Sequence, residues 1–295
     1  MSRTDVEFDV AGDACAAWIY EPEGADPHQG RPVVVMAHGL SGTRRDGLGA
    51  FAERFAGHGC FALVFDHRGF GDSAGTADLF HPGRQLEDWR HAIAFARRWP
   101  GVDPGRVVTF GSSMGGGNAL AAAAGDTRVA AAISQVPFLD IVRQAYRASP
   151  KAMGRMVVAA LRGDHMPAVG QPHEAAFINA PDSEAGWRHV VAIGEDSRWR
   201  NRVSSRWLLG RPFNPGRHAK RLHCPWLVCV GGADRVARPS VAIAAAKRAP
   251  HGVLRVYPGV DHFDVYDGAG HETVIADELA FLERHVLTDE ERGQT

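Results

Sequence analysis

The sequence predicts an α/β fold, in which a doubly wound, mostly parallel sheet is interrupted by a helical insertion. Short apolar runs rich in β-branched residues alternate with helix-like segments along most of the 295-residue chain. These runs are apolar throughout instead of at every second position, which is typical of parallel strands that helices cover on both faces. The alternation stops between about residues 141 and 220 and then resumes.

The expected elements follow the order that such a sheet requires. A hairpin comes first, because Val6–Val10 and Ala14–Tyr20 are separated by Ala-Gly-Asp and precede the first buried run, so the pair belongs at a sheet edge. Helices then connect the parallel strands, since parallel neighbours need a crossover. We expect strands at 33–37, 61–65, 106–110, 129–134, 226–230 and 254–257, and helices near 45–58, 86–98, 115–125, 239–249 and 271–286.

The interrupted stretch predicts a cap. It follows a strand that ends in "SQVPFLD", and it contains several prolines, short helical patterns and no run typical of a parallel strand. Open α/β sheets bind ligands at the carboxyl ends of their strands, so an insertion at this point would cover the site. We therefore divide the chain into a core of residues 1–140 and 221–295 and a cap insertion of residues 141–220.

Composition excludes several classes of protein. The chain is 45% hydrophobic and 23% charged with a net charge of −1, so we expect neither nucleic acid nor a membrane surface as a partner. The first residues lack the apolar core of a signal peptide, which favours the cytoplasm. The four cysteines show no metal-ligand spacing, and we expect no metal and no cofactor. Self-association into a homodimer is left open.

The stretch "GSSMGG" predicts a nucleophile at Ser113. The G-x-S-x-G motif is weak alone, but here the strand "RVVTF" leads into it and a helix follows it. Such a turn strains the central residue and brings strand and helix so close that Gly111 and Gly115 cannot carry side chains. A structural glycine-rich turn is the alternative interpretation.

A serine hydroxyl needs a base, and the base needs a carboxylate to orient it. Asp234 follows one buried strand and His262 follows the next, so both should lie near Ser113 in the chain order serine, acid, histidine. Asp261 and Asp264 are rival carboxylates, but neighbours of His262 in sequence are badly placed to reach its far nitrogen.

The loop "AHGLSGT" after the first buried strand is the expected source of oxyanion donors. We assign this role to the backbone N–H of Leu40 together with that of Met114, the residue after the nucleophile. His38 is interpreted as a residue that shapes the loop and not as a second base.

The segments "AHGLSGT", "DHRGFGDSAG", "GSSMGG", "GGADRVARP" and "DHFDVY" resemble the α/β-hydrolases in order and spacing, over residues 31 to 286 apart from the cap. The chain is most similar to serine hydrolases related to dienelactone hydrolases and to S15-peptidase-like esterases, including the polyketide-acyltransferase-like branch. The resemblance implies a triad of Ser113, Asp234 and His262, and a structural framework of Asp66 and Arg68. A serine at the nucleophile position departs from true dienelactone hydrolases, which carry cysteine, and from epoxide hydrolases and haloalkane dehalogenases, which need aspartate.

Substrate choice is expected to lie in the cap. We name Phe138, Trp187, Trp199 and Trp207 as substrate-binding candidates, although packing between cap and core is the alternative for each. "FINAPDSEAGW" resembles the cap of the polyketide-transferase-like branch, which favours bulky acyl groups. The sequence thus predicts a serine hydrolase of small-molecule carboxylic esters or thioesters that works through an acyl-enzyme. An acyltransferase with the same triad, or a ligand-binding homologue with slow turnover, remains as an alternative.

Overall fold

An eight-stranded sheet forms the centre of the computed structural model, which describes residues 1–145 and 149–287. The strands lie in the order β1-β2-β4-β3-β5-β6-β9-β10, and all neighbours from β4 to β10 pair in parallel. The antiparallel hairpin of β1 and β2 occupies one edge, as predicted. The strands are β1 Ser2–Val10, β2 Asp13–Glu21, β3 Arg31–Ala37, β4 Phe61–Phe65, β5 Val102–Ser112, β6 Val129–Gln135, β9 Trp226–Gly231 and β10 Gly252–Tyr257.

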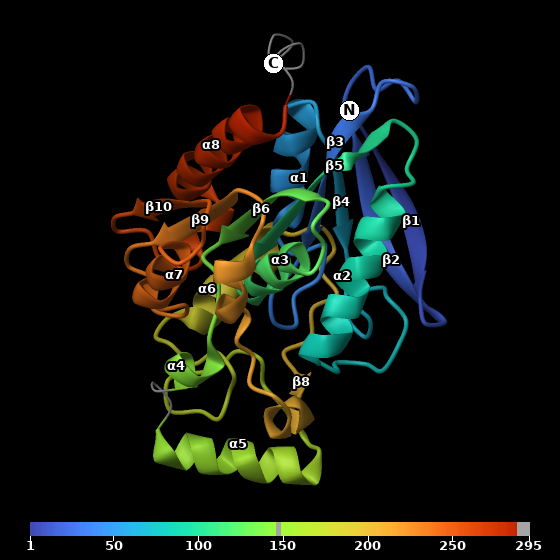
Figure 1. Cartoon of the computed structure of the whole chain (residues 1–295). Coiled ribbons are helices and arrows are strands. Elements are labelled where there is room, and N and C mark those ends of the chain that lie inside the picture. The colour runs from blue at the N-terminus through green and yellow to red at the C-terminus, as the bar shows by residue number, and fades with distance from the viewer. Residues whose placement is uncertain (146–148, 288–295) are drawn as a thin grey trace.

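Helices cover both faces of the sheet (Figure 1). Alternate residues of β3 enter two different cores: Val33 and Val35 pack with α2, α3 and α7, whereas Val34 and Met36 pack with α1 and α8. The predicted doubly wound α/β fold is therefore confirmed. These helices are α1 Leu48–Gly57, α2 Pro82–Ala96, α3 Met114–Ala124, α7 Pro239–Ala246 and α8 Gly268–His285.

Several boundaries differ from expectation, and the largest differences are at β1, β5 and α2, which each begin four residues earlier than predicted. Strand β5 begins at Val102, four residues before the expected start at 106, because an irregular register toward β3 extends the pairing through a turn-like stretch. Helix α2 begins at Pro82, four residues before the expected start at 86, because the His81 side chain caps it by accepting the Arg84 N–H.

The segment predicted as a cap adds no described strand to the central sheet. Its two short strands pair only with each other among the described residues. Figure 1 shows α5 at the end of the molecule opposite the two termini, with α4 and β8 between it and the sheet. The elements are α4 Ile141–Ala145, α5 Pro150–Arg162, β7 His165–Met166, α6 Ser183–Ile193, β8 Val203–Ser204, and the 3₁₀ helices η1 Ser205–Leu209 and η2 Pro215–Arg221.

A third hydrophobic cluster joins this segment to the core. Leu40 and Met114 contribute from the core, and Trp187, Trp207 and Phe213 contribute from the insertion. In the two described ranges, no helix combines the length and apolar composition needed to cross a membrane. All four cysteines are buried, and none of them forms a disulfide in the described part of the chain.

Candidate active site

Ser113 lies on a strained turn between β5 and α3. Its φ of 57° and ψ of −123° are unusual for a residue with a side chain. A Cβ at Gly111 would stand 2.2 Å from the Gly115 carbonyl oxygen, and a Cβ at Gly115 would stand 2.5 Å from the Ala37 carbonyl oxygen. The two glycines are therefore needed where β3, β5 and α3 converge, and the turn presents the hydroxyl at the first turn of α3.

Asp234, His262 and Ser113 form a continuous hydrogen-bonded chain. The His262 Nε2 lies 3.0 Å from the Ser113 Oγ, and the His262 Nδ1 lies 2.7 Å from the Asp234 Oδ2. Asp234 follows β9, His262 follows β10 and Ser113 follows β5, and the carboxyl ends of these parallel strands lie at the same edge of the sheet. All three residues are buried, with at most 6% of their surface exposed. With a proton on Nδ1, the imidazole is oriented to accept the serine proton at Nε2.

The second oxygen of Asp234 fixes the orientation of the carboxylate. Oδ1 accepts the backbone N–H of Val236 at 2.8 Å and that of Ala237 at 2.7 Å. The two rival carboxylates are engaged elsewhere. Asp261 binds the Arg235 guanidinium and the His262 backbone N–H, and the Asp264 carboxylate accepts the Asp261 backbone N–H at 2.7 Å.

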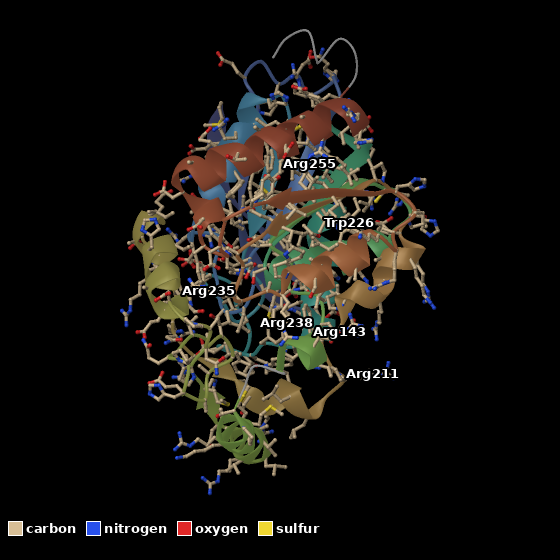
Figure 2. The ribbon with its side chains drawn as sticks, turned by 90° about the vertical axis from the view of Figure 1, so that its left-hand side faces the viewer. Arg143, Arg211, Trp226, Arg235, Arg238 and Arg255 are labelled. Atoms are coloured by element: carbon tan, nitrogen blue, oxygen red, sulfur yellow. The ribbon has the colours of Figure 1, made fainter. Side chains whose placement is uncertain are left out.

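Arg235 connects this side of the sheet to the insertion. Besides Asp261, its guanidinium reaches the Asp182 carboxylate at 3.0 Å, at the start of α6. Figure 2 shows Arg235 beside that helix. The Asp261 carboxylate is thus engaged by Arg235, while the described partner of the His262 Nδ1 is Asp234.

The loop after β3 lies directly against the nucleophile turn. A Cβ at Gly39 would stand 3.2 Å from the Met114 nitrogen and from the Ser113 Cβ. Among the described residues, the backbone N–H groups of Leu40 and Met114 have no hydrogen-bond acceptor. Free backbone donors in two segments that meet at the nucleophile turn are suited to an oxyanion, and this role of Leu40 and Met114 stays a prediction.

A contact with the insertion supports this loop. Ser41 follows Leu40 with a φ of 56°, in the left-handed region, and its Oγ accepts the indole N–H of Trp199 at 3.0 Å. Ser41 was not predicted from the sequence, because its partner Trp199 stands 158 positions away and no local pattern links the two.

His38 packs inside the same loop. It is 2% exposed, and burial together with the nearby His67 lowers the pKa of its imidazole to about 3. A Cβ at Gly42 would stand 2.8 Å from its Nδ1, so the ring fills the interior of the turn. A neutral, enclosed imidazole fits a residue that shapes the loop.

Below the loop, Asp66 and Arg68 bind separate partners and not each other. Asp66 accepts the backbone N–H and the guanidinium of Arg44, and Arg68 binds Asp88 at 2.5 Å. These buried pairs hold the "DHRGFGDSAG" turn under the site.

An apolar cavity of about 570 Å³ lies close to the triad, although Ser113, Asp234 and His262 are not among its described lining residues. Two of its lining residues contact catalytic candidates directly: the Phe138 N–H donates to the Ser113 carbonyl, and the Val236 N–H donates to Asp234. The remaining walls come mostly from the insertion, and they include Met153, Met156, Phe177 and Leu208. We call this space the acyl cavity, after the role that we propose for it below.

The four predicted substrate-binding residues lie in different places. Phe138 lines the acyl cavity, whereas the three tryptophans do not. The Trp187 ring packs 5.8 Å from that of Trp199 and 6.2 Å from that of Phe263, next to His262. Trp207 stacks on Phe177 at 5.3 Å, behind the cavity wall. Their role toward substrate stays a prediction.

Comparison with known proteins agrees with this architecture. The family model described as "Serine aminopeptidase, S33" matches residues 28–274. The chain is 38% identical to the quorum-quenching protein AidA of Acinetobacter baumannii over 96% of this chain and 95% of that one. It is 27% identical to the polyketide transferase af380 of Aspergillus fumigatus, over 97% and 99% of the two chains. The crystal structure of the α/β hydrolase GrgF from Penicillium superimposes with a TM-score of 0.79 at 22% identity, over 97% of this chain and 99% of that one.

Proposed function

We propose that this chain, which belongs to the serine aminopeptidase S33 family of α/β-hydrolases, cleaves carboxylic esters or thioesters through a covalent acyl-enzyme. The observation that carries the proposal is the chain of contacts from Asp234 through His262 to Ser113, at 2.7 and 3.0 Å, beside two unpaired backbone donors. Nothing else among the described contacts offers a nucleophile, a base and an oxyanion site together.

In the first half of the reaction, Ser113 attacks the substrate carbonyl. His262 Nε2 takes the hydroxyl proton while Oγ forms a bond to the carbonyl carbon. The negative charge that develops on the carbonyl oxygen is stabilised by the N–H groups of Leu40 and Met114. Collapse of the tetrahedral intermediate expels the alcohol or thiol, which receives the proton from His262.

In the second half, water repeats the sequence on the acyl-enzyme. His262 accepts a proton from water, the hydroxide adds to the acyl carbon, and the Ser113 Oγ leaves with the proton. The products are a carboxylic acid and the free enzyme. The acyl group would occupy the acyl cavity, whose volume of about 570 Å³ suits medium-chain or aromatic groups.

Acyl transfer to an alcohol or amine is the second candidate function. The name of the polyketide transferase relative and the burial of the triad favour it, because transfer requires that water be kept from the acyl-enzyme.

The test is a panel of p-nitrophenyl esters and acyl thioesters of increasing chain length, with the Ser113→Ala variant as the comparison. We expect turnover by the parent and a loss of several orders of magnitude in the variant, with an unchanged melting temperature. A serine-directed phosphonate should label the parent and not the variant. Added alcohols that yield new esters would assign transfer. Labelling that persists in the variant would place the nucleophile elsewhere, and absence of turnover with every ester would favour a ligand-binding homologue.

A further inference from the structure

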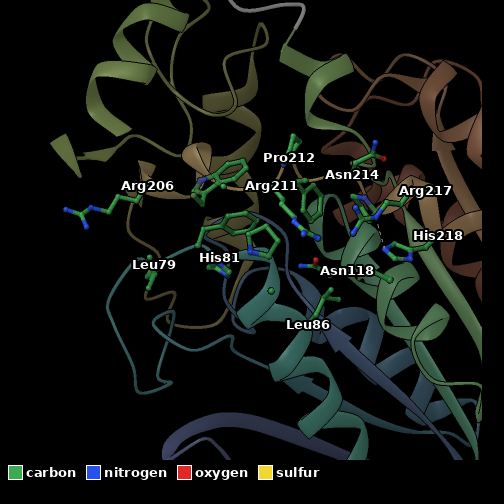
Figure 3. A pocket seen from close by; sticks show the side chains of 18 residues that line it. Leu79, His81, Leu86, Asn118, Arg206, Arg211, Pro212, Asn214, Arg217 and His218 are labelled. Atoms are coloured by element: carbon green, nitrogen blue, oxygen red, sulfur yellow. Dashed lines mark hydrogen bonds between the residues drawn. The ribbon is translucent and has the colours of Figure 1, made fainter. Parts of the chain in front are cut away.

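A second cavity, of about 420 Å³, lies outside the catalytic machinery. It is enclosed by the start of α2, the middle of α3 and residues 206–218 of the insertion (Figure 3). Trp207 lines this cavity, and its ring stacks on Phe177, a wall residue of the acyl cavity. The two cavities are therefore neighbours, and the stacked rings of Trp207 and Phe177 lie between them.

The described lining of the second cavity contains arginine and histidine but neither aspartate nor glutamate. Figure 3 shows the Arg211 side chain pointing into the cavity toward Asn118, with Arg217 beside His218. The Arg217 Nε lies 3.2 Å from the His218 Nε2, and burial together with the neighbouring arginines lowers the pKa of His218. Arg211 and Arg217 are both exposed at the surface, and together they give this side of the cavity a positive potential.

The local sequence provides no carboxylate to neutralise these arginines. No acidic residue stands between Asp196 and Asp234. Earlier arginines of this stretch pair with the core, since Arg200 and Arg202 both bind Asp78 at 3.0 Å. Within the described part of the chain, neither Arg211 nor Arg217 forms an ion pair.

The start of α2 adds to the positive potential. The helix begins at Pro82 with no acidic residue in its first turn, and Gly83 borders the cavity. The partial positive charge of a helix N-terminus favours an anion. It acts here together with the inward-pointing Arg211, which is the stronger feature.

Apolar rings form the other walls. Phe80 packs edge-on against Trp207 at 4.9 Å and against Phe213 at 6.1 Å, and Leu86 completes this side. Positive charge at one side and aromatic surface at the other match a ligand that carries an anionic group on an apolar body.

We propose that this cavity is a binding site for a carboxylate on an apolar body of medium-chain or aryl size. Arg211 receives the carboxylate through its planar fork of N–H donors, and the rings of Phe80, Trp207 and Phe213 contact the apolar part. The ligand is either an acid released by the enzyme or an acid from another source, and the binding itself does not require ester cleavage.

The test measures binding of octanoate by calorimetry in the Ser113→Ala background, where no turnover can interfere. Octanol and inorganic phosphate are the matched probes for the apolar body and the charge. We expect octanoate to bind at least tenfold more tightly than either. Arg211→Gln should weaken octanoate binding at least tenfold, and Arg217→Gln should weaken it less.

Arg206→Gln is the control. Arg206 borders the same cavity but points away from it in Figure 3, toward Gly163 at the end of α5, so its loss should leave octanoate affinity unchanged. Equal affinity for octanol, equal effects of Arg206→Gln and Arg211→Gln, or no octanoate binding would each overturn the proposal. Ester turnover, measured separately in the parent, decides the proposed function independently of these results.

Discussion

Replacement of Asp234 by asparagine should nearly abolish catalysis while preserving the fold. The two backbone donors on Oδ1, from Val236 and Ala237, hold the amide oxygen of the new side chain in that position. The amide NH₂ must then face the His262 Nδ1, where the carboxylate oxygen stands at 2.7 Å. Because the NH₂ can only donate, Nδ1 must accept, and the imidazole proton moves to Nε2. The imidazole then presents a proton to Ser113 and cannot take one.

The alternative amide orientation does not rescue the variant. It would turn the NH₂ toward the two backbone N–H groups and forfeit two hydrogen bonds, each worth about 1 kcal/mol net and more when buried donors are left unpaired. Locking the wrong tautomer in a serine protease triad costs about 10⁴ in kcat. We expect a similar loss here, which corresponds to about 5 kcal/mol of transition-state stabilisation.

The assay is kcat/KM for a short p-nitrophenyl ester, with thermal unfolding as a check on the fold. Asp261→Asn is the matched control, since that carboxylate binds Arg235 and a backbone N–H but not the imidazole. It should cost less than tenfold. The reasoning is refuted if Asp261→Asn is the inactive variant, or if Asp234→Asn stays within tenfold of the parent.

Two further predictions concern the oxyanion loop. Trp199→Phe removes the indole N–H that binds the Ser41 Oγ at 3.0 Å. Because a hydrogen bond contributes about 1 kcal/mol net, we expect kcat to fall about fivefold with little change in KM. Trp187→Phe is the control, since its indole N–H has no partner in the described residues, and equal effects of the two variants would contradict a role for the Ser41 contact. The pKa of His38 is about 3 in the folded chain and about 6.5 in the unfolded chain, so the unfolded chain takes up the proton first as the pH falls. At pH values below about 6.5, the free energy of unfolding should therefore decrease, by up to about 1.4 kcal/mol per pH unit. Urea unfolding at pH 7.5 and 5.5 should show a smaller loss in His38→Gln, and an unchanged loss would contradict this account.

The sequence was sufficient to predict the core and the central contacts of the site. Buried parallel strands have a clear apolar signature, and their carboxyl ends meet at one edge, so chain order alone places Asp234 and His262 near Ser113. The glycines at 111 and 115 report the close approach of strand and helix, because any side chain there collides with backbone.

The insertion could not be predicted in the same way. Its side chains act through partners that are distant in sequence, as Trp199 does with Ser41, and no periodic pattern specifies such pairs. Trp187, Trp199 and Trp207 are apolar residues predicted to bind substrate, yet the described lining of the acyl cavity contains Met153, Met156 and Phe177 and none of these tryptophans. The second cavity is not evident from the sequence, because the absence of an ion pair at Arg211 and Arg217 can be recognised only once their surroundings are known.

The same contacts lead us to predict that the insertion influences the chemistry, in addition to the role in substrate choice that the sequence predicts for it. Trp199 reaches the residue next to Leu40, and Phe138 joins the Ser113 carbonyl to the wall of the acyl cavity. An acyl chain that displaces this wall would therefore act on the turn that carries the nucleophile. Selectivity among acyl groups should consequently appear in kcat as well as in KM, whereas a pocket that only binds would change KM alone.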